Sequence, residues 1–159
     1  TGAIDPMDQL ADVAQEFAVF SLGSSQFALG VIQVREVLRA AALSLSPASP
    51  NIEGLFNLRG NVIPVVDLRS KLNLPVSEIQ TSDFLIVFGT DARSAALRTG
   101  EPVQLESVGE SCIETSSQHG LVMGTIRILE KVVSLLDVEA LLDLAGSTKA
   151  GIDHTTSQD

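Results

Sequence analysis

A thirteen-residue segment that occurs twice constrains the fold of this chain more than any other feature. The segment VIPVVDLRSKLNL (62–74) aligns without gaps on VVSLLDVEALLDL (132–144), and Asp67 falls on Asp137. The pattern predicts a strand that ends at an aspartate, whose carboxylate N-caps the helix that follows. A looser match links FAVFSLGSSQFAL with FLIVFGTDARSAAL. We therefore expect two similar β-subdomains, each too small to be robust alone.

Short apolar runs between Gly, Ser, Asn and Asp fill most of the remaining chain. Val, Ile and Phe dominate these runs, which predicts β-hairpins over residues 17–31, 55–66 and 84–97. Short helices are predicted after Asp67 and Asp137. Many short strands at close spacing indicate an all-β protein built from barrels or a sandwich, and not a parallel α/β sheet.

Composition excludes several classes of function. The chain has 159 residues and a net charge of −10, so nucleic acid is an unfavourable partner. It has one cysteine, Cys112, and two histidines, which excludes a disulfide framework and most metal sites. No apolar run approaches the roughly 20 residues of a membrane span. We expect a cytoplasmic protein that does not insert into a membrane.

The two ends are expected to lie outside the folded unit. Residues 1–6 (TGAIDP) before Met7 read as a tag remnant, and residues 1–15 are expected to form a flexible tail that contains a short helix over 7–15. The Ser/Thr/Gly-rich residues 146–159 form the second expected tail. Residues 16–145 then make up a single domain of two β-subdomains.

The hairpin over residues 55–66 carries the strongest candidate site. With Gly60 and Asn61 as its turn, Arg59 is predicted to lie opposite Val62, and Asn57 opposite Pro64. Because proline cannot donate to a β-ladder, Pro64 indicates an edge or a covering segment. Asn57 and Arg59 then lie side by side next to that edge. Arg59 braces its own subdomain, for instance against Asp67, or binds a partner's carboxylates and carbonyls, or does both.

The motif GLFNLRGNVIPVVDL (54–68) resembles the signature of the CheW-like family of chemotaxis coupling proteins. The opening FAVFSLGSSQFALGVIQVREVL (17–38) and the closing VVSLLDVEALL resemble the first strands and the last strand and helix of that family. The resemblance covers about residues 16–144. It implies two small five-stranded, SH3-like β-barrels around a shared groove.

The function is implied by this resemblance alone. Members of the family are adaptors without catalysis or cofactors, and they bridge the cytoplasmic tips of chemoreceptors to the regulatory domain of a CheA-type histidine kinase, in arrays at the inner membrane. Matching positions at the partner surfaces are Val34, Glu36, Asn57, Arg59 and Gly60, and matching structural positions are Gly54, Pro64 and Asp67.

The second half departs from the family pattern. Where the family has Val-Asp-Gly-Val, this chain has Arg98-Thr99-Gly100-Glu101, and the segment over 109–120 is shorter than usual. We expect these charges to lie on a partner surface and to weaken kinase binding. Two alternatives stay open: a diverged adaptor of a pilus or gliding pathway that binds one partner, and a β-barrel interaction module outside chemotaxis.

Enzymatic function is not indicated. Cys112 and His119 lie in a polar stretch without a nucleophile elbow, and His154 lies in the expected tail. No phosphate loop or dinucleotide-binding pattern is present. Asp137 and Glu139 are better explained as charges that favour a helix N-terminus.

Overall fold

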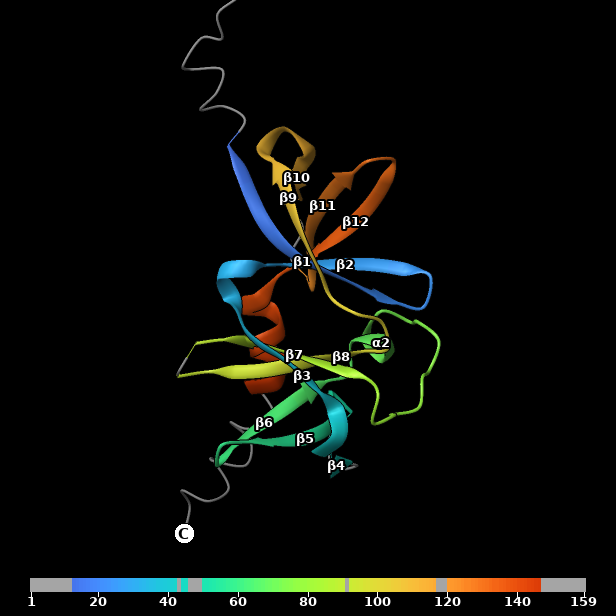
Figure 1. The fold of residues 1–159 in the computed structure, drawn as a ribbon, viewed down its shortest axis with the longest axis vertical. Helices are drawn as coiled ribbons and strands as arrows, with labels where there is room; N and C mark the ends of the chain where they lie inside the picture. The colour runs from blue at the N-terminus through green and yellow to red at the C-terminus, as the bar shows by residue number, and fades with distance from the viewer. Residues whose placement is uncertain (1–12, 43, 46–49, 91, 117–119, 147–159) are drawn as a thin grey trace, which may run out of the picture.

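The computed structural model describes residues 13–42, 44–45, 50–90, 92–116 and 120–146 (Figure 1). Most of the regular structure in this part of the chain is β-strand, which confirms the all-β class. The strands are β1 (Ala14–Leu22), β2 (Ser25–Gly30), β3 (Val34–Arg39), β4 (Ser44–Leu45), β5 (Ile52–Leu58), β6 (Asn61–Val66), β7 (Phe84–Gly89), β8 (Ser94–Thr99), β9 (Gln104–Gly109), β10 (Ile113–Thr115), β11 (Val122–Ile128) and β12 (Lys131–Leu136). The helical segments are η1 (Val31–Gln33), η2 (Ala40–Ala42), α2 (Leu68–Lys71), η3 (Glu110–Cys112) and a helix over residues 138–146.

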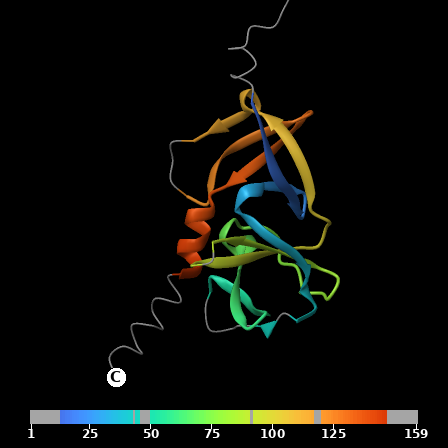
Figure 2. The same cartoon turned by 60° about the vertical axis from the view of Figure 1, so that its left-hand side comes forward.

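The strands form two sheets, and the chain passes through one of them twice. One sheet has the order β3-β7-β8-β6-β5-β4 and comes from a single stretch, residues 34–99; we call it the contiguous subdomain. The other has the order β10-β11-β12-β2-β1-β9 and combines the β1–β2 hairpin with strands from the end of the chain; we call it the split subdomain (Figures 1 and 2). The expected pair of β-subdomains is confirmed. Each sheet has six strands, because the very short strands β4 and β10 extend the edges.

The repeated segment forms the same unit in both subdomains. β6 ends at Asp67, whose Oδ1 accepts a hydrogen bond from the Ser70 N–H at 3.1 Å at the start of α2. β12 ends at Asp137, whose Oδ1 accepts from the Ala140 N–H at 3.3 Å in the helix over 138–146. Each of these strands also pairs in parallel with the second strand of a hairpin, β6 with β8 and β12 with β2. The capped strand–helix units predicted from the repeat are confirmed.

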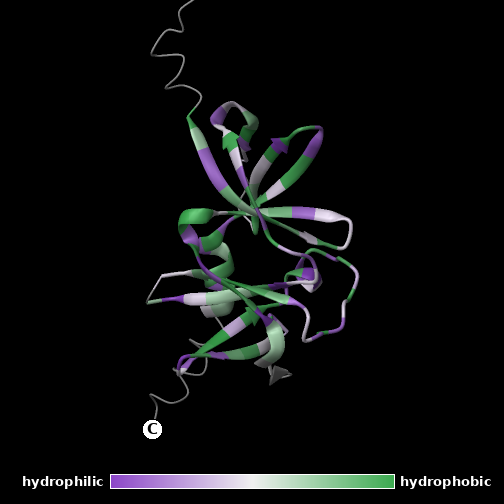
Figure 3. Cartoon of the chain, in the orientation of Figure 1, coloured by the Kyte–Doolittle hydropathy of each residue, from purple (hydrophilic) through white to green (hydrophobic). Residues whose placement is uncertain are grey.

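Each buried strand contributes side chains to two hydrophobic clusters, one on each face of its sheet. On β1, Phe17 and Val19 pack inside the split subdomain, whereas Phe20 and Leu22 join a large cluster that both subdomains share. β7 divides in the same way, since Ile86 belongs to the shared cluster. A strand that is covered on both faces reads as a continuous apolar run, and Figure 3 shows such runs in the middle of the molecule. The shared cluster makes the two subdomains one packing unit.

The three predicted hairpins are present, but the register predicted for the β5–β6 hairpin is wrong. Leu58 lies opposite Asn61, so Arg59 and Gly60 form the two-residue turn and Asn57 lies opposite Val62. Arg59 and Gly60 both have positive φ angles, 52° and 89°. Such a turn matches the twist of the flanking strands, and this favours the observed register over one with Gly60 and Asn61 at the turn.

The structure also bears on the expected tails. The prediction of a helix over 7–15 is wrong for its last two residues, because Ala14 and Gln15 begin β1 and pair with β9. Residues 7–12 lie outside the described residues. The proposed tag remnant also lies outside them. Gly146 is the last described residue of the final helix, and 147–159 lie outside the described residues.

Candidate functional site

Arg59 and Glu36 form a bidentate ion pair on the surface of the contiguous subdomain. Arg59 Nη1 donates to Glu36 Oε2 at 2.7 Å, and Nη2 donates to Oε1 at 2.9 Å. Glu36 lies on β3 and Arg59 in the β5–β6 turn, although β7, β8 and β6 separate β3 from β5 in the sheet order. The contact therefore joins β3, at one edge of a curled sheet, to the β5–β6 turn near the other edge. Two parallel N–H···O bonds are the arrangement that the planar guanidinium favours.

The pair is exposed and stays charged. The Arg59 side chain is 70% exposed and the Glu36 side chain 28% exposed. The hydrogen bond from Arg59 lowers the pKa of Glu36, and the same bond raises the pKa of Arg59. Arg59 is thus braced by Glu36, and not by Asp67, while its side chain stays largely exposed to a partner. Both roles considered for Arg59 are compatible with this geometry.

A β-bulge sets the position of Glu36. The register between β3 and β7 shifts between Val34 and Glu36, which leaves Arg35 as the extra residue. Arg35 Nη1 donates to the Thr90 backbone oxygen at 3.1 Å and to Ser94 Oγ at 2.9 Å, so the bulge is anchored to the β7–β8 loop. Val34 packs against the shared core, and Glu36 pairs with Arg59.

The turn that carries Arg59 is held by Asn57. The Asn57 side-chain oxygen accepts a hydrogen bond from the Gly60 N–H at 2.9 Å, which closes the turn from inside. Asn57, Arg59 and Gly60 are therefore one structural unit: asparagine fixes the turn, glycine permits it and arginine projects from it. Of the residues predicted to contact a partner, the structure brings Glu36, Asn57, Arg59 and Gly60 together, whereas Val34 is partly buried and packs against the shared core.

Gly54 and Pro64, which were predicted to have structural roles, lie in different surroundings. Gly54 is buried opposite Val65, beside a bulge that contains Glu53. Pro64 was expected next to an edge or a covering segment; β6 is not an edge strand, because it lies between β5 and β8 in the sheet order. Pro64 is tolerated there because the pairing of β6 with β8 is limited to Val65 and Ala96, so the missing N–H interrupts no long ladder.

The expectation that Arg98 presents a charge to a partner is wrong. The Arg98 side chain is 1% exposed, and it pairs with Asp83 and, at 2.9 Å, with Glu53. It also donates to the backbone oxygens of Ser77 and Glu78, so it clamps the segment before β7 onto the barrel. A buried charge requires such partners because desolvation is otherwise too costly.

Thr99 is buried as well, and it connects the subdomains. Its Oγ1 donates to the Ser21 backbone oxygen of β1 at 2.7 Å and accepts from the Glu101 N–H at 3.2 Å. Glu101 itself is exposed. One feature of the sequence indicates that Arg98 is buried: it follows Ala95, Ala96 and Leu97 in a strand that has no other charged residue. A single charge in such an apolar strand indicates a buried ion pair.

Within the described residues, no group of His, Cys, Asp and Glu is placed to hold a metal ion. Cys112 is half-buried against the core of the split subdomain. His119 and His154 lie outside the described residues. None of the helices in the described ranges is both long enough and apolar enough to cross a membrane.

Residues 16–146 match the family model described as the CheW-like domain. The chain is 31% identical over 148 residues to a chemotaxis protein CheW of Bacillus subtilis strain 168, which covers 88% of this chain and 94% of that protein. It is 26% identical over 137 residues to a chemotaxis protein CheW of Helicobacter pylori, which covers 80% of this chain and 81% of that protein.

A solved structure has a similar fold. The scaffolding protein TtCheW from Thermoanaerobacter tengcongensis superimposes with a TM-score of 0.69 at 24% identity, over 79% of this chain and 90% of that one. The overlap extends through both subdomains, since it is larger than either alone.

Proposed function

The chain belongs to the CheW-like domain family, and from that membership we propose that it is a non-enzymatic chemosensory adaptor. It couples the cytoplasmic tips of chemoreceptors to the regulatory domain of a CheA-type histidine kinase. It acts in the cytoplasm, in receptor arrays at the inner membrane. Asn57, Arg59, Gly60 and Glu36 form the receptor contact, and Val34 supports the strand that carries Glu36.

The exposed Arg59–Glu36 pair is the observation that supports the receptor contact. Two of the five guanidinium N–H groups bind Glu36, and the other three can donate to carbonyls or carboxylates at the turn of a helical hairpin. Glu36 fixes the direction of the guanidinium before a partner arrives, which reduces the entropy that binding must remove. The ion pair thus preorganises Arg59 as a donor.

The alternative of an adaptor with one partner has lost part of its physical basis. That alternative rested on the charges of Arg98 and Glu101 and on the short segment over 109–120. The structure shows Arg98 buried and paired with Asp83 and Glu53, whereas Glu101 is exposed. Arg98, which lies on β8 of the contiguous subdomain, therefore presents no charge to the kinase. We keep both partners in the proposal.

Reconstitution tests the proposal. The chain is mixed with a receptor signalling fragment and a CheA-type kinase of the same organism, and kinase sedimentation with the receptor and autophosphorylation are measured. Both should depend on the chain. Arg59→Ala should reduce both, whereas Arg93→Ala, which removes an exposed arginine paired with Asp143, should not.

Size-exclusion chromatography separates the two partners. The chain and the isolated kinase regulatory domain should elute together with wild-type protein and with Arg59→Ala, because Arg59 is assigned to the receptor. Separate elution of the wild-type mixture, with no receptor-dependent kinase activity, would show that the chain is an interaction module outside chemotaxis.

A further inference from the structure

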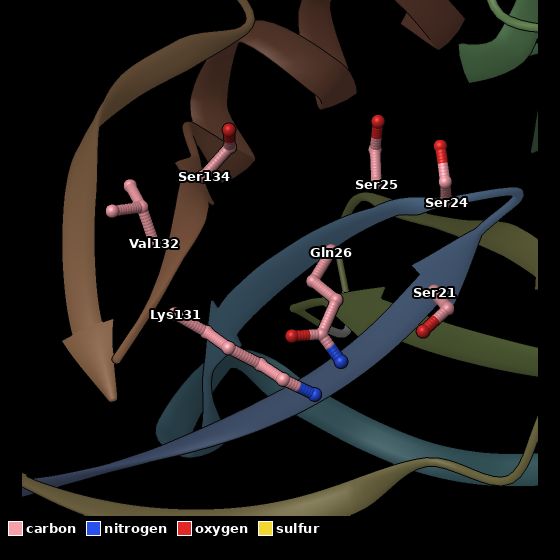
Figure 4. Close-up of a pocket in the computed structure, with 7 residues that line it drawn as sticks. All are labelled: Ser21, Ser24, Ser25, Gln26, Lys131, Val132 and Ser134. Carbon is pink, nitrogen blue, oxygen red and sulfur yellow. The ribbon is translucent and has the colours of Figure 1, made fainter. Parts of the chain in front are cut away.

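A groove opens where β2 and β12 separate. The two parallel strands pair only at Ser134–Phe27 and Leu135–Ala28. Before these positions, residues 131–133 pair with β11 alone and residues 25–26 with β1 alone. The space between them is about 600 Å³, and Figure 4 shows it between the β1–β2 hairpin and β12. Its lining includes Ser24, Ser25, Gln26, Lys131, Val132 and Ser134.

Within the part of the chain that the structure describes, five polar side chains of this groove have no hydrogen-bond or ion-pair partner. Among the described residues, none forms a hydrogen bond or ion pair with the side chains of Ser24, Ser25, Gln26, Lys131 or Ser134. In Figure 4 the Lys131 side chain extends across the groove towards Gln26. Two strand edges with unused backbone groups therefore flank a set of unused side-chain donors and acceptors. This combination suits an added strand, whose backbone pairs with such an edge.

The tip of the β11–β12 hairpin adds apolar surface beside the groove. Leu129 is 91% exposed and Val132 67% exposed. Leu129 also has a φ of 56°, a conformation that strains a leucine and that glycine or asparagine adopts more easily. Arg59 holds the corresponding place in the β5–β6 turn. A strained, exposed leucine gains nothing from intramolecular packing, so its apolar surface is available to a partner.

We infer that the β2–β12 groove and the β11–β12 tip form a second protein-docking surface, which takes an extended segment of a partner protein. The segment adds a strand along β12, places apolar side chains on Leu129 and Val132, and places an acidic side chain near Lys131. Lys131 is the only charged residue in the lining, on a chain whose net charge is −10. The inference goes beyond the proposed receptor contact, which uses the other subdomain.

A peptide-display experiment tests this surface. A phage library of random linear decapeptides is selected on the immobilised full-length chain and depleted on the double variant Leu129→Asn, Val132→Thr. Enriched peptides are synthesised and titrated into the full-length chain by NMR. Asparagine tolerates the positive φ at position 129, so the Tm of Leu129→Asn should be unchanged or higher. Loss of binding in that variant is then not a loss of folding.

The expected peptides alternate β-branched or aromatic residues with an acidic one. On binding, they should shift the resonances of residues 24–27 and 131–134. Val132→Thr or Lys131→Ala should lower the affinity of the chain for these peptides by at least about fivefold. Val62→Thr, at the position of β6 that matches Val132, is the control and should leave the affinity unchanged. The inference is wrong if no peptide survives depletion, if Val132→Thr binds as wild type does, or if the shifts map to the Arg59 turn. None of these outcomes depends on whether the receptor contact is correct.

Discussion

At the scale of single residues, arginine has two opposite roles in this chain. Arg59 is exposed and binds a single carboxylate, that of Glu36, so its remaining N–H donors face solvent. Arg98 is enclosed by two carboxylates and two backbone oxygens, so all of its interactions are internal. The same side chain therefore serves recognition in one place and packing in the other, and the number of partners within the fold decides which.

Arg59→Ala should weaken binding of a receptor-tip fragment by more than about tenfold, because it removes a charge-assisted fork. Arg59→Lys should recover only part of the affinity, since a point charge cannot reproduce two parallel bonds. Isothermal titration calorimetry measures both. The Tm should fall by only a few degrees, because exposed ion pairs contribute little to stability. Unchanged affinity, or an unfolded variant, would leave Arg59 with the bracing role alone.

Arg98→Met should lower the free energy of unfolding by about 3–5 kcal/mol, because it removes the cation that is hydrogen-bonded to the buried carboxylates of Glu53 and Asp83. Urea unfolding followed by circular dichroism measures the change. The triple variant Arg98→Met, Glu53→Gln, Asp83→Asn removes all three charges and should be more stable than Arg98→Met alone. If the single and triple variants lose stability equally, the loss comes from packing and not from unpaired charge.

Glu53 should make stability depend on pH. Burial raises the pKa of Glu53 in spite of its hydrogen bond to Arg98. The folded state then holds this proton more tightly than the unfolded state, so the contribution of Glu53 to stability falls as pH rises from its ordinary pKa, about 4.3, through the raised value. The stability of wild type minus that of Glu53→Gln should decrease over that window. A difference that is constant with pH, or that increases, contradicts the raised pKa.

At the scale of elements, the two-residue turns and the bulges determine which side chains meet. The β5–β6 turn places Arg59 at the hairpin tip, and the β3 bulge turns Glu36 towards it. A register shifted by one residue would send alternate side chains of the hairpin to the other face. The site therefore depends on backbone conformation at a few positions as much as on the identity of the charged residues.

Gly60→Ala should destabilise the protein by about 1 kcal/mol, because alanine is strained at a φ of 89°. A Cβ at this position meets no atom within 4 Å, so the cost is conformational and not steric crowding. Gly60→Asn is the control, since asparagine tolerates positive φ, and it should lose less. Urea unfolding measures both variants. Equal losses would show that side-chain conformational preference is not the cause.

At the scale of the whole molecule, chain order and spatial order differ. The split subdomain needs the first and last thirds of the chain, while the contiguous subdomain lies between them in sequence. The shared core takes Phe20, Ile86 and Leu141 from all three parts. Neither subdomain can bury its apolar surface until the C-terminal strands have been added.

A fragment that ends at Thr81 should therefore remain unfolded. It lacks β7 and β8 of the contiguous subdomain and β9 to β12 of the split one, so neither sheet is complete. The intact chain should melt in one cooperative transition by calorimetry. A dispersed NMR spectrum of the fragment, or two separate transitions of the intact chain, would show that the subdomains fold independently.

Local features of the fold could be predicted from the sequence. The hairpins, the aspartate caps at Asp67 and Asp137, and the paired β-subdomains follow from patterns that span about fifteen residues or fewer, and they are present in the structure. Short-range hydrogen bonds and alternating hydrophobicity specify such features, because the interacting groups are neighbours in sequence. The hairpin pattern also singled out Asn57 and Arg59, whereas Glu36 and Gly60 were expected at a partner surface from the resemblance to the CheW-like family.

Only the tertiary structure decided which charges meet. Glu36 lies 23 residues from Arg59, and Glu53 lies 45 from Arg98. With twenty acidic residues in the chain, spacing cannot select these two partners. Because the sheet curls, Glu36 comes within hydrogen-bond distance of Arg59. Because β8 is buried, the charge of Arg98 has to be paired with carboxylates inside the protein. An ion pair is fixed by the positions that packing imposes, and the sequence does not state those positions locally.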